Sequence, residues 1–254
     1  MKTFVISLPD AAVRREKIKN NFFEKNINYE LVNGVDKKDL IFLKDLSGFY
    51  FQNNLFKINS TNHKLYTNRS WFRYGEIANV FAHYQIWKKV SNDSEPNCLI
   101  CEDDCYPSKN FTLDLLNQFD LNVNEFIYLQ ATTAHYQNKN MLISDLPNDE
   151  RNSKLKKITK NKNIICEGTA AYCISKGACK KLCDYLEVTG FDGPIDNLIS
   201  RLSDFNLFCP SDIDNYFYLD DTSKFSYTHH GQFGYKYTNG DVELNSTFEV
   251  LFKD

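Results

Sequence analysis

The amino-acid sequence predicts an α/β fold: a doubly wound, largely parallel sheet with helices on both faces, in a single domain over residues 1–254. Two observations lead to this prediction. Short apolar runs are continuous rather than alternating, as in strands that are buried on both faces. Segments of helical period lie between these runs, and the resulting strand–helix order is typical of such sheets.

The strands and helices are predicted in turn from these runs and from capping residues. Each strand is a run of four or five apolar residues, and the helices carry apolar residues at helical spacing, a Ser cap or a proline in the first turn. The predicted strands are Phe4–Leu8, Cys98–Cys101, Phe126–Leu129 and Ala170–Ile174. The predicted helices are Asp10 to about Lys25, Gly75–Val90, Ser175–Leu186 and Pro194–Leu202. Ser47–Arg73 and Gln137–Asn163 are expected to be loops or mobile lids.

Composition excludes several classes of protein. A net charge of −3 argues against a nucleic-acid binder, and no apolar run has the length of a membrane span. The N-terminus becomes polar too soon for a signal peptide, so the eight cysteines are expected to be reduced and buried. We expect a cytoplasmic protein with at most peripheral contact with a membrane, at its inner face.

The segment NCLICEDDCYPSKNF (97–111) places three consecutive carboxylates, Glu102, Asp103 and Asp104, at the end of a predicted buried strand. An unpaired buried carboxylate costs several kcal/mol, so the cluster requires a divalent metal, a group of Arg or Lys residues, or solvent. Sheets of this type bind ligands beyond the carboxyl ends of their strands. Two of these side chains can bind Mg²⁺ or Mn²⁺ while the third forms hydrogen bonds.

Five sequence blocks occur in an order that resembles glycosyltransferase family 25, which includes lipooligosaccharide and collagen galactosyltransferases. They cover roughly residues 3–200: FVISLPDAAVRREKI, VNGVD, GEIANVFAHYQIWKKV, CLICEDDCYPSKNF and GTAAYCISKGACKKL with GPID. The chain departs from the family pattern at Ala78, Asn79 and Ala82. The resemblance implies a GT-A fold, a UDP-sugar donor (most often UDP-galactose), Mn²⁺ or Mg²⁺, and an Asp-x-Asp role for EDD.

By this analogy Glu102 and Asp104 bind the metal, Asp103 hydrogen-bonds the ribose or the sugar, and His229 or its neighbour His230 completes the metal shell. Arg14 either reaches a phosphate or the uracil edge, or is a solvated surface residue. The remaining positions that we expect to bind the donor are Ser7, Leu8, Asp36, Glu76 and His83.

Several of these residues have a structural alternative. Asp36 can bind the nucleoside or cap a helix that begins at Lys37. Glu76 and His83 share one helix face with Asn79 and can line the donor pocket, but a lone His is often structural. Asp196, with Asp192 as second choice, is the expected general base, although a carboxylate in the first turn of a helix is also favoured by the helix dipole.

Together with the resemblance, these residues lead us to expect a metal-dependent, inverting transfer of a hexose, with galactose as first choice, from a UDP-hexose to a hydroxyl of a glycan, glycolipid or glycoprotein. The first alternative is a non-catalytic domain that binds nucleotide sugars or glycans. The second is a Mg²⁺-dependent phosphoesterase, which would need further carboxylates or an N-terminal Asp-x-Asp, and the first strand has none. No nucleic-acid partner is expected.

Overall fold

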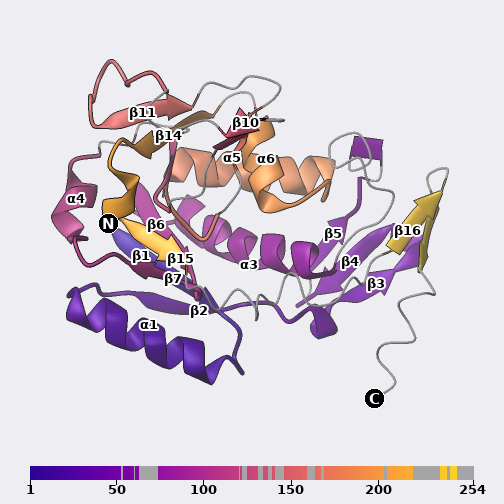
Figure 1. Cartoon of the computed structure of the whole chain (residues 1–254). Helices are drawn as coiled ribbons and strands as arrows, with labels where there is room; N and C mark the ends of the chain where they lie inside the picture. Colours follow the sequence, from indigo (N-terminus) through magenta and orange to yellow (C-terminus); the bar gives the residue numbers. More distant parts are fainter. Residues whose placement is uncertain are drawn as a thin grey trace.

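The computed structural model of the chain contains a seven-stranded sheet that is covered by helices (Figure 1). It describes residues 1–52, 54–59, 61–62, 74–119, 121, 125–130, 134–136, 139–140, 146–158, 164–166, 169–202, 205–219, 235–238 and 241–244. The strands follow the order β11-β14-β8-β13-β6-β1-β2 across the sheet. Their bounds are β1 Lys2–Ser7, β2 Glu30–Asn33, β6 Asn97–Glu102, β8 Glu125–Tyr128, β11 Leu155–Ile158, β13 Ala171–Ser175 and β14 Asn206–Pro210.

Strand direction partly corrects the predicted, largely parallel sheet. Five of the seven strands run in one direction, while β13 and β11 run in the other. Since β13 lies between β6 and β8, three of the six pairings are antiparallel and the sheet is mixed. A strand that is buried on both faces has the same continuous apolar sequence in either direction, so this difference is invisible to the pattern.

Two separate hydrophobic clusters lie on the two faces of the sheet. Phe4, Ile100 and Tyr172 point into the cluster that packs against helices α3 (Tyr74–Ser91), α5 (Lys176–Thr189) and α6 (Ile195–Arg201). Their neighbours Val5 and Leu99 belong to the other cluster, with α1 (Ala12–Glu24) and α4 (Leu113–Asn117). Alternate side chains of a strand point to opposite faces. The predicted α/β class, with helices on both faces, is therefore confirmed.

The predicted helices and strands all form, with ends that shift by a few residues. Ser175 caps α5, because its side chain accepts a hydrogen bond from the Ala178 amide at 3.2 Å. Gly190 ends the same helix with a φ of +85°, and a Cβ there would lie 2.6 Å from the carbonyl oxygen of Lys57. Glycine is thus required where α5 meets β5.

The two predicted loops contain strands, so this part of the prediction is wrong. Within 47–73 the chain forms β4 (Gly48–Phe51) and β5 (Asn54–Lys57), which pair with β3 (Ile41–Leu43). Phe49 and Phe56 bury one face of this small sheet against the α3 side of the core. Within 137–163 lie β10 (Lys139–Asn140) and β11, and β11 is an edge strand of the large sheet.

In the described part of the chain no helix is long and apolar enough to cross a membrane. The remaining elements are short strands and 3-10 turns. β7 pairs with β15, β9 with β10 and β12, and β16 with β17. The bounds are β7 Cys105–Pro107, β9 Ala134–Tyr136, β12 Ile164–Cys166, β15 Phe217–Leu219, β16 Tyr235–Thr238, β17 Asp241–Leu244, and the 3-10 turns η1 Lys37–Asp39, η2 Lys44–Leu46 and η4 Ile213–Asn215.

Candidate active site

Strand ends from distant parts of the sequence meet at one edge of the large sheet. β1 and β6 are parallel, with Ile6 paired to Glu102, so both strands end there, at Ser7 and Glu102. The antiparallel β13 begins at this edge instead of ending there. As a result the amide of Glu102 donates to the carbonyl of Ala170 at 2.7 Å, and the residues just before β13 lie beside the carboxylates.

Asp103 is held by two side chains that follow β1. The Ser7 hydroxyl donates to its Oδ2 at 2.7 Å, and Nη1 of Arg14 donates to its Oδ1 at 2.7 Å. All three side chains are mostly or fully shielded from solvent. Arg14 is therefore part of the site and not the solvated surface residue of the alternative interpretation. Both carboxylate oxygens of Asp103 accept hydrogen bonds from the protein itself, so Asp103 is well placed to orient Arg14.

Glu102 receives three hydrogen bonds on a single oxygen. His83 Nε2 lies 3.2 Å from Oε1, Asn79 Nδ2 donates to it at 3.3 Å, and the Thr169 hydroxyl donates at 3.5 Å. Among the described residues none donates to Oε2, and the side chain remains 23% exposed. Burial alone would raise the pKa of Glu102, but the bonds from His83, Asn79 and Thr169 outweigh it and lower that pKa. Glu102 is therefore an ionised carboxylate with one oxygen still available.

His83 continues this network into the core. Its Nδ1 lies 2.7 Å from the hydroxyl of Tyr172, to which the indole of Trp87 donates at 3.0 Å. The predicted shared face of α3 is confirmed for Asn79 and His83, which both reach Glu102. His83 itself is fully buried and reaches the site through Glu102, so a direct contact with the donor stays a prediction.

Asp104 differs from its two neighbours in lacking a complete set of partners. Its Oδ1 is buried and has no hydrogen-bond partner among the described residues, while Oδ2 lies 3.9 Å from Nη1 of Arg14. Burial and the adjacent charge of Glu102 raise the pKa of Asp104 to about 7, although Arg14 opposes this shift. A buried, partnerless carboxylate oxygen beside a second carboxylate favours a bound cation.

The fit of a divalent metal to these residues is partial. Asp104 Oδ1 and Glu102 Oε2 are hard oxygen atoms of the kind that Mg²⁺ and Mn²⁺ prefer. The described residues contain no group of three or more His, Cys, Asp or Glu side chains arranged to hold a metal ion. Mg²⁺ sites commonly take one or two carboxylates and complete their shell with substrate phosphates, so two ligands are compatible with the chemistry. His229 and His230 lie outside the described residues.

Three other residues were predicted to bind the donor: Asp36, Leu8 and Glu76. Asp36 caps η1, because its side chain accepts from the Lys38 amide at 2.9 Å, so the capping alternative is realised. The Leu8 carbonyl accepts from Nε of Arg15 at 2.9 Å, which fixes the turn after β1. Glu76 is half-buried in the first turn of α3. For these three residues a contact with the donor stays a prediction.

Asp192 and Asp196 lie around the start of α6 and differ in access. Asp192 is 1% exposed, and its Oδ2 accepts a hydrogen bond from the hydroxyl of Tyr185. Asp196 is half-buried in the first turn of α6, and its Oδ1 accepts from the Asn197 amide at 2.8 Å. A general base must reach the acceptor hydroxyl, so access favours Asp196 over Asp192 for this role, which stays a prediction.

Comparison with known families decides the class of enzyme. The profile of glycosyltransferase family 25, described as an LPS biosynthesis protein, matches residues 1–199. The chain belongs to glycosyltransferase family 25. It is therefore a glycosyltransferase, as predicted from the five sequence blocks. This membership favours an enzyme over the alternative of a non-catalytic binding domain.

Two further comparisons add little to the family 25 assignment. No curated protein matches the chain. One similar solved structure is a crystal structure of the galactosyltransferase LgtC in complex with donor and acceptor sugar analogs. It has a TM-score of 0.38 and 7% identity over 82% of this chain and 73% of that one. That TM-score is below the range that indicates a common fold.

Three residues of this family 25 site were not singled out from the sequence: Thr169, Tyr172 and Trp87. Thr169 and Tyr172 belong to the block GTAAYCISKGACKKL, and Trp87 belongs to the Gly75–Val90 helix, but no pattern assigned them a role. The available signal was their polarity within otherwise apolar elements. Buried Tyr and Trp side chains usually need a hydrogen-bond partner, and here each partner leads toward Glu102.

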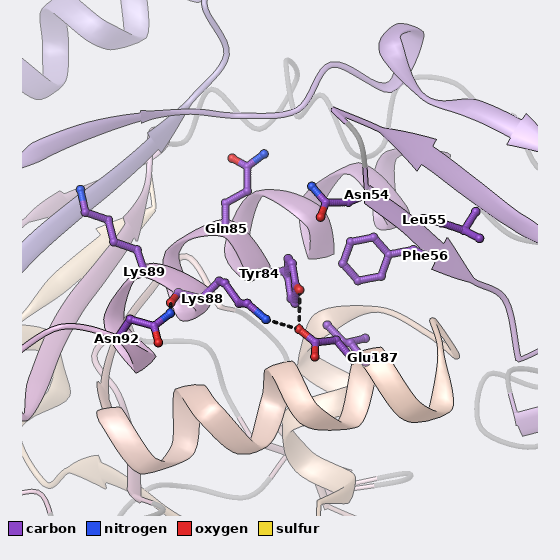
Figure 2. Close-up of a pocket in the computed structure, with 10 residues that line it drawn as sticks. Asn54, Leu55, Phe56, Tyr84, Gln85, Lys88, Lys89, Asn92 and Glu187 are labelled. Carbon is purple, nitrogen blue, oxygen red and sulfur yellow. Dashed lines mark hydrogen bonds and ion pairs between the residues drawn. The ribbon is translucent and has the colours of Figure 1, made fainter.

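A cavity of about 640 Å³ lies elsewhere in the family 25 chain, along the C-terminal half of α3 (Figure 2). Tyr84 and Lys88, one turn apart on α3, both point toward Glu187 of α5 and hydrogen-bond it. The cavity shares no lining residue with the carboxylate cluster, and its central charges neutralise each other. It is therefore not the candidate active site.

Proposed function

We propose that this family 25 enzyme transfers a hexose, with galactose as first candidate, from a UDP-sugar to a hydroxyl of a glycan acceptor, with inversion and with a divalent metal. Membership of the family supports a nucleotide-sugar donor and a glycan acceptor. The observation that carries the metal part is the buried Oδ1 of Asp104, which has no partner among the described residues.

In this proposal Asp104 and Glu102 hold Mn²⁺ or Mg²⁺, which supplies positive charge to the diphosphate of the leaving group. Arg14, held by Asp103, lies 3.9 Å from Asp104 and adds a second positive charge at the same edge. A guanidinium is well suited to phosphate, since it presents several donors in one plane. The two charges together favour departure of UDP with the electron pair of the broken bond.

Asp196 is the proposed general base. As the acceptor oxygen forms its bond to the anomeric carbon, the Asp196 carboxylate takes the hydroxyl proton from the face opposite UDP. Asp196 is half-buried whereas Asp192 is 1% exposed, and this difference in access supports the choice.

The test is UDP release from a panel of UDP-sugars with Mn²⁺ or with EDTA, for wild type, Asp104→Ala and the matched control Asp10→Ala. Asp10 is an exposed carboxylate after β1, outside the cluster. We expect release that prefers one sugar, needs metal, and is lost in Asp104→Ala but kept in Asp10→Ala. Equal release in EDTA would refute the metal requirement, and equal release from Asp104→Ala would remove Asp104 from the site. Hydrolysis of simple phosphoesters instead would identify a phosphoesterase.

A further inference from the structure

Three fully buried side chains form a relay that ends on Glu102. Trp87, Tyr172 and His83 are each 0% exposed. Trp87 Nε1 lies 3.0 Å from the Tyr172 hydroxyl, which lies 2.7 Å from Nδ1 of His83, and Nε2 of His83 lies 3.2 Å from Oε1 of Glu102. A buried polar group that lacks a hydrogen-bond partner is destabilising, so we expect every polar hydrogen of this relay to be donated to a partner.

Only one assignment of the protons satisfies every member of the relay. The Trp87 indole can only donate, so the Tyr172 oxygen accepts from it and its own proton is free to go to His83. His83 then accepts at Nδ1 and carries its proton on Nε2, from where it donates to the Glu102 carboxylate. With the proton on Nδ1 instead, the lone pair of Nε2 would face a negative oxygen at 3.2 Å. A doubly protonated His83 would leave the buried Tyr172 proton without an acceptor.

We propose that Tyr172 is a positioning residue. By donating to Nδ1 of His83 it fixes the Nε2–H tautomer, which saturates Oε1 of Glu102 and leaves Oε2 for the metal. This inference deepens the proposed function and rests on its metal site. Metal ligands are commonly oriented in this way by partners behind them, whose loss typically costs 10–100-fold in affinity.

Tyr172 is well suited to this task because its ring cannot easily move. It stacks on His83 at 5.6 Å between centroids, and on Phe126 at 4.5 Å. Tyr172→Phe therefore removes the hydroxyl and keeps the ring in place. The matched control is Tyr128→Phe, which removes a buried hydroxyl from the neighbouring strand, at the position paired with Tyr172 but outside the relay.

The first readout is the ¹⁵N NMR spectrum of the protein labelled at histidine, without metal or substrate. The chain has five His residues, and His83→Gln assigns the His83 signals by their absence. We expect an unprotonated Nδ1 and a protonated Nε2 in wild type and in Tyr128→Phe. In Tyr172→Phe only Glu102 still favours this tautomer, so its population should be lower than in wild type. A wild-type His83 with its proton on Nδ1 overturns the proposal.

The second readout is Mn²⁺ affinity in the presence of UDP, measured by the electron paramagnetic resonance signal of free Mn²⁺. We expect the dissociation constant to rise roughly tenfold in Tyr172→Phe and to change less than twofold in Tyr128→Phe. The amide of His83→Gln can accept from Tyr172 and donate to Glu102, so this variant should bind Mn²⁺ more tightly than His83→Leu. That comparison also serves if Tyr172→Phe does not fold.

The results separate this inference from the proposed function. Mn²⁺-dependent UDP release by wild type with an unchanged Mn²⁺ affinity in Tyr172→Phe overturns the role of Tyr172 and keeps the function. Equal Mn²⁺ affinities of His83→Gln and His83→Leu would likewise overturn the role of Tyr172 and keep the proposed function. A wild type that binds no Mn²⁺ but shows the Nε2–H tautomer refutes the metal site, and with it the role proposed for the relay.

Discussion

Arg14 and Asp103 form an ion pair with 2.7 Å between Nη1 and Oδ1, although 89 residues separate them along the chain. The pair joins the first turn of α1 to the end of β6. It also keeps the guanidinium beside Asp104, so one arginine balances two carboxylates.

We expect Arg14→Met to lower kcat/KM for UDP release by roughly 10–100-fold, the equivalent of the 1.5–3 kcal/mol of one hydrogen bond to a charged group. Two carboxylates would lose their counter-charge and the leaving diphosphate would lose a donor. Steady-state kinetics with Mn²⁺ measures this. The control is Lys19→Met, which removes an exposed charge from the same helix and should have no effect. A change of less than twofold in Arg14→Met would contradict a role at the diphosphate.

Stability without metal should fall as the pH rises from about 4 to 7. Asp104 has a pKa of about 7 in the folded protein and an ordinary value near 3.8 when unfolded, so in this window only the folded state keeps the proton. Unfolding then releases a proton, and the free energy of unfolding decreases by roughly 2–4 kcal/mol.

Urea unfolding in EDTA at several pH values tests this slope, with Asp104→Asn as the comparison. The amide does not titrate, so the variant should lose most of the decrease between pH 5 and 7. An equal slope in both proteins would mean that another group causes it. Added Mn²⁺ should oppose the decrease in wild type, because it binds the ionised carboxylate.

Substitution of the two aspartates at the start of α6 should have different effects, on the rate of transfer for Asp196 and on stability for Asp192. Asp196→Asn is expected to reduce the rate of transfer about 10²–10⁴-fold while leaving donor binding and thermal stability near wild type, since only a proton acceptor is lost. Asp192→Ala should instead cost about 1–3 kcal/mol of stability, because the hydroxyl of Tyr185 loses its buried acceptor. Kinetics and calorimetry on both variants separate the two roles. An Asp196→Asn enzyme with full activity would eliminate Asp196 as the base.

Two glycines of one helix should respond to alanine with opposite signs. At Gly190 the φ of +85° and the Lys57 oxygen at 2.6 Å both oppose a Cβ, so Gly190→Ala should lose at least about 1–3 kcal/mol. Gly177 lies in the first turn of α5 and has no positive φ, so Gly177→Ala should gain about 0.5–1 kcal/mol. Denaturant unfolding of the two variants measures both changes. A Gly190→Ala variant with unchanged stability would show that β5 shifts to make room for the added Cβ.

Local sequence was enough to predict the main helices, the central strands and the carboxylate cluster. Glu102, Asp103 and Asp104 are adjacent, so their mutual repulsion is visible without a fold. Tyr172 lies 70 residues beyond Glu102, and only the pairing of β13 with β6 brings it close. The strand Gly48–Phe51 was missed because a short aromatic segment next to glycine reads equally well as a loop. The partner of Arg14 was likewise set by tertiary structure.

The reversed direction of β13 has a consequence for how such enzymes can diversify. The 42 residues between β8 and β13 leave the sheet at the end that carries Glu102, contribute its edge strand β11, and enter β13 at the same end. Doubling a flexible connection raises its closure entropy cost by only about 0.6 kcal/mol. Insertions or deletions in this connection outside β11 leave Ser7 on β1, Glu102 on β6 and His83 on α3 where they are. We therefore expect the length of this connection to vary more between family 25 members than the strands that carry the carboxylate cluster.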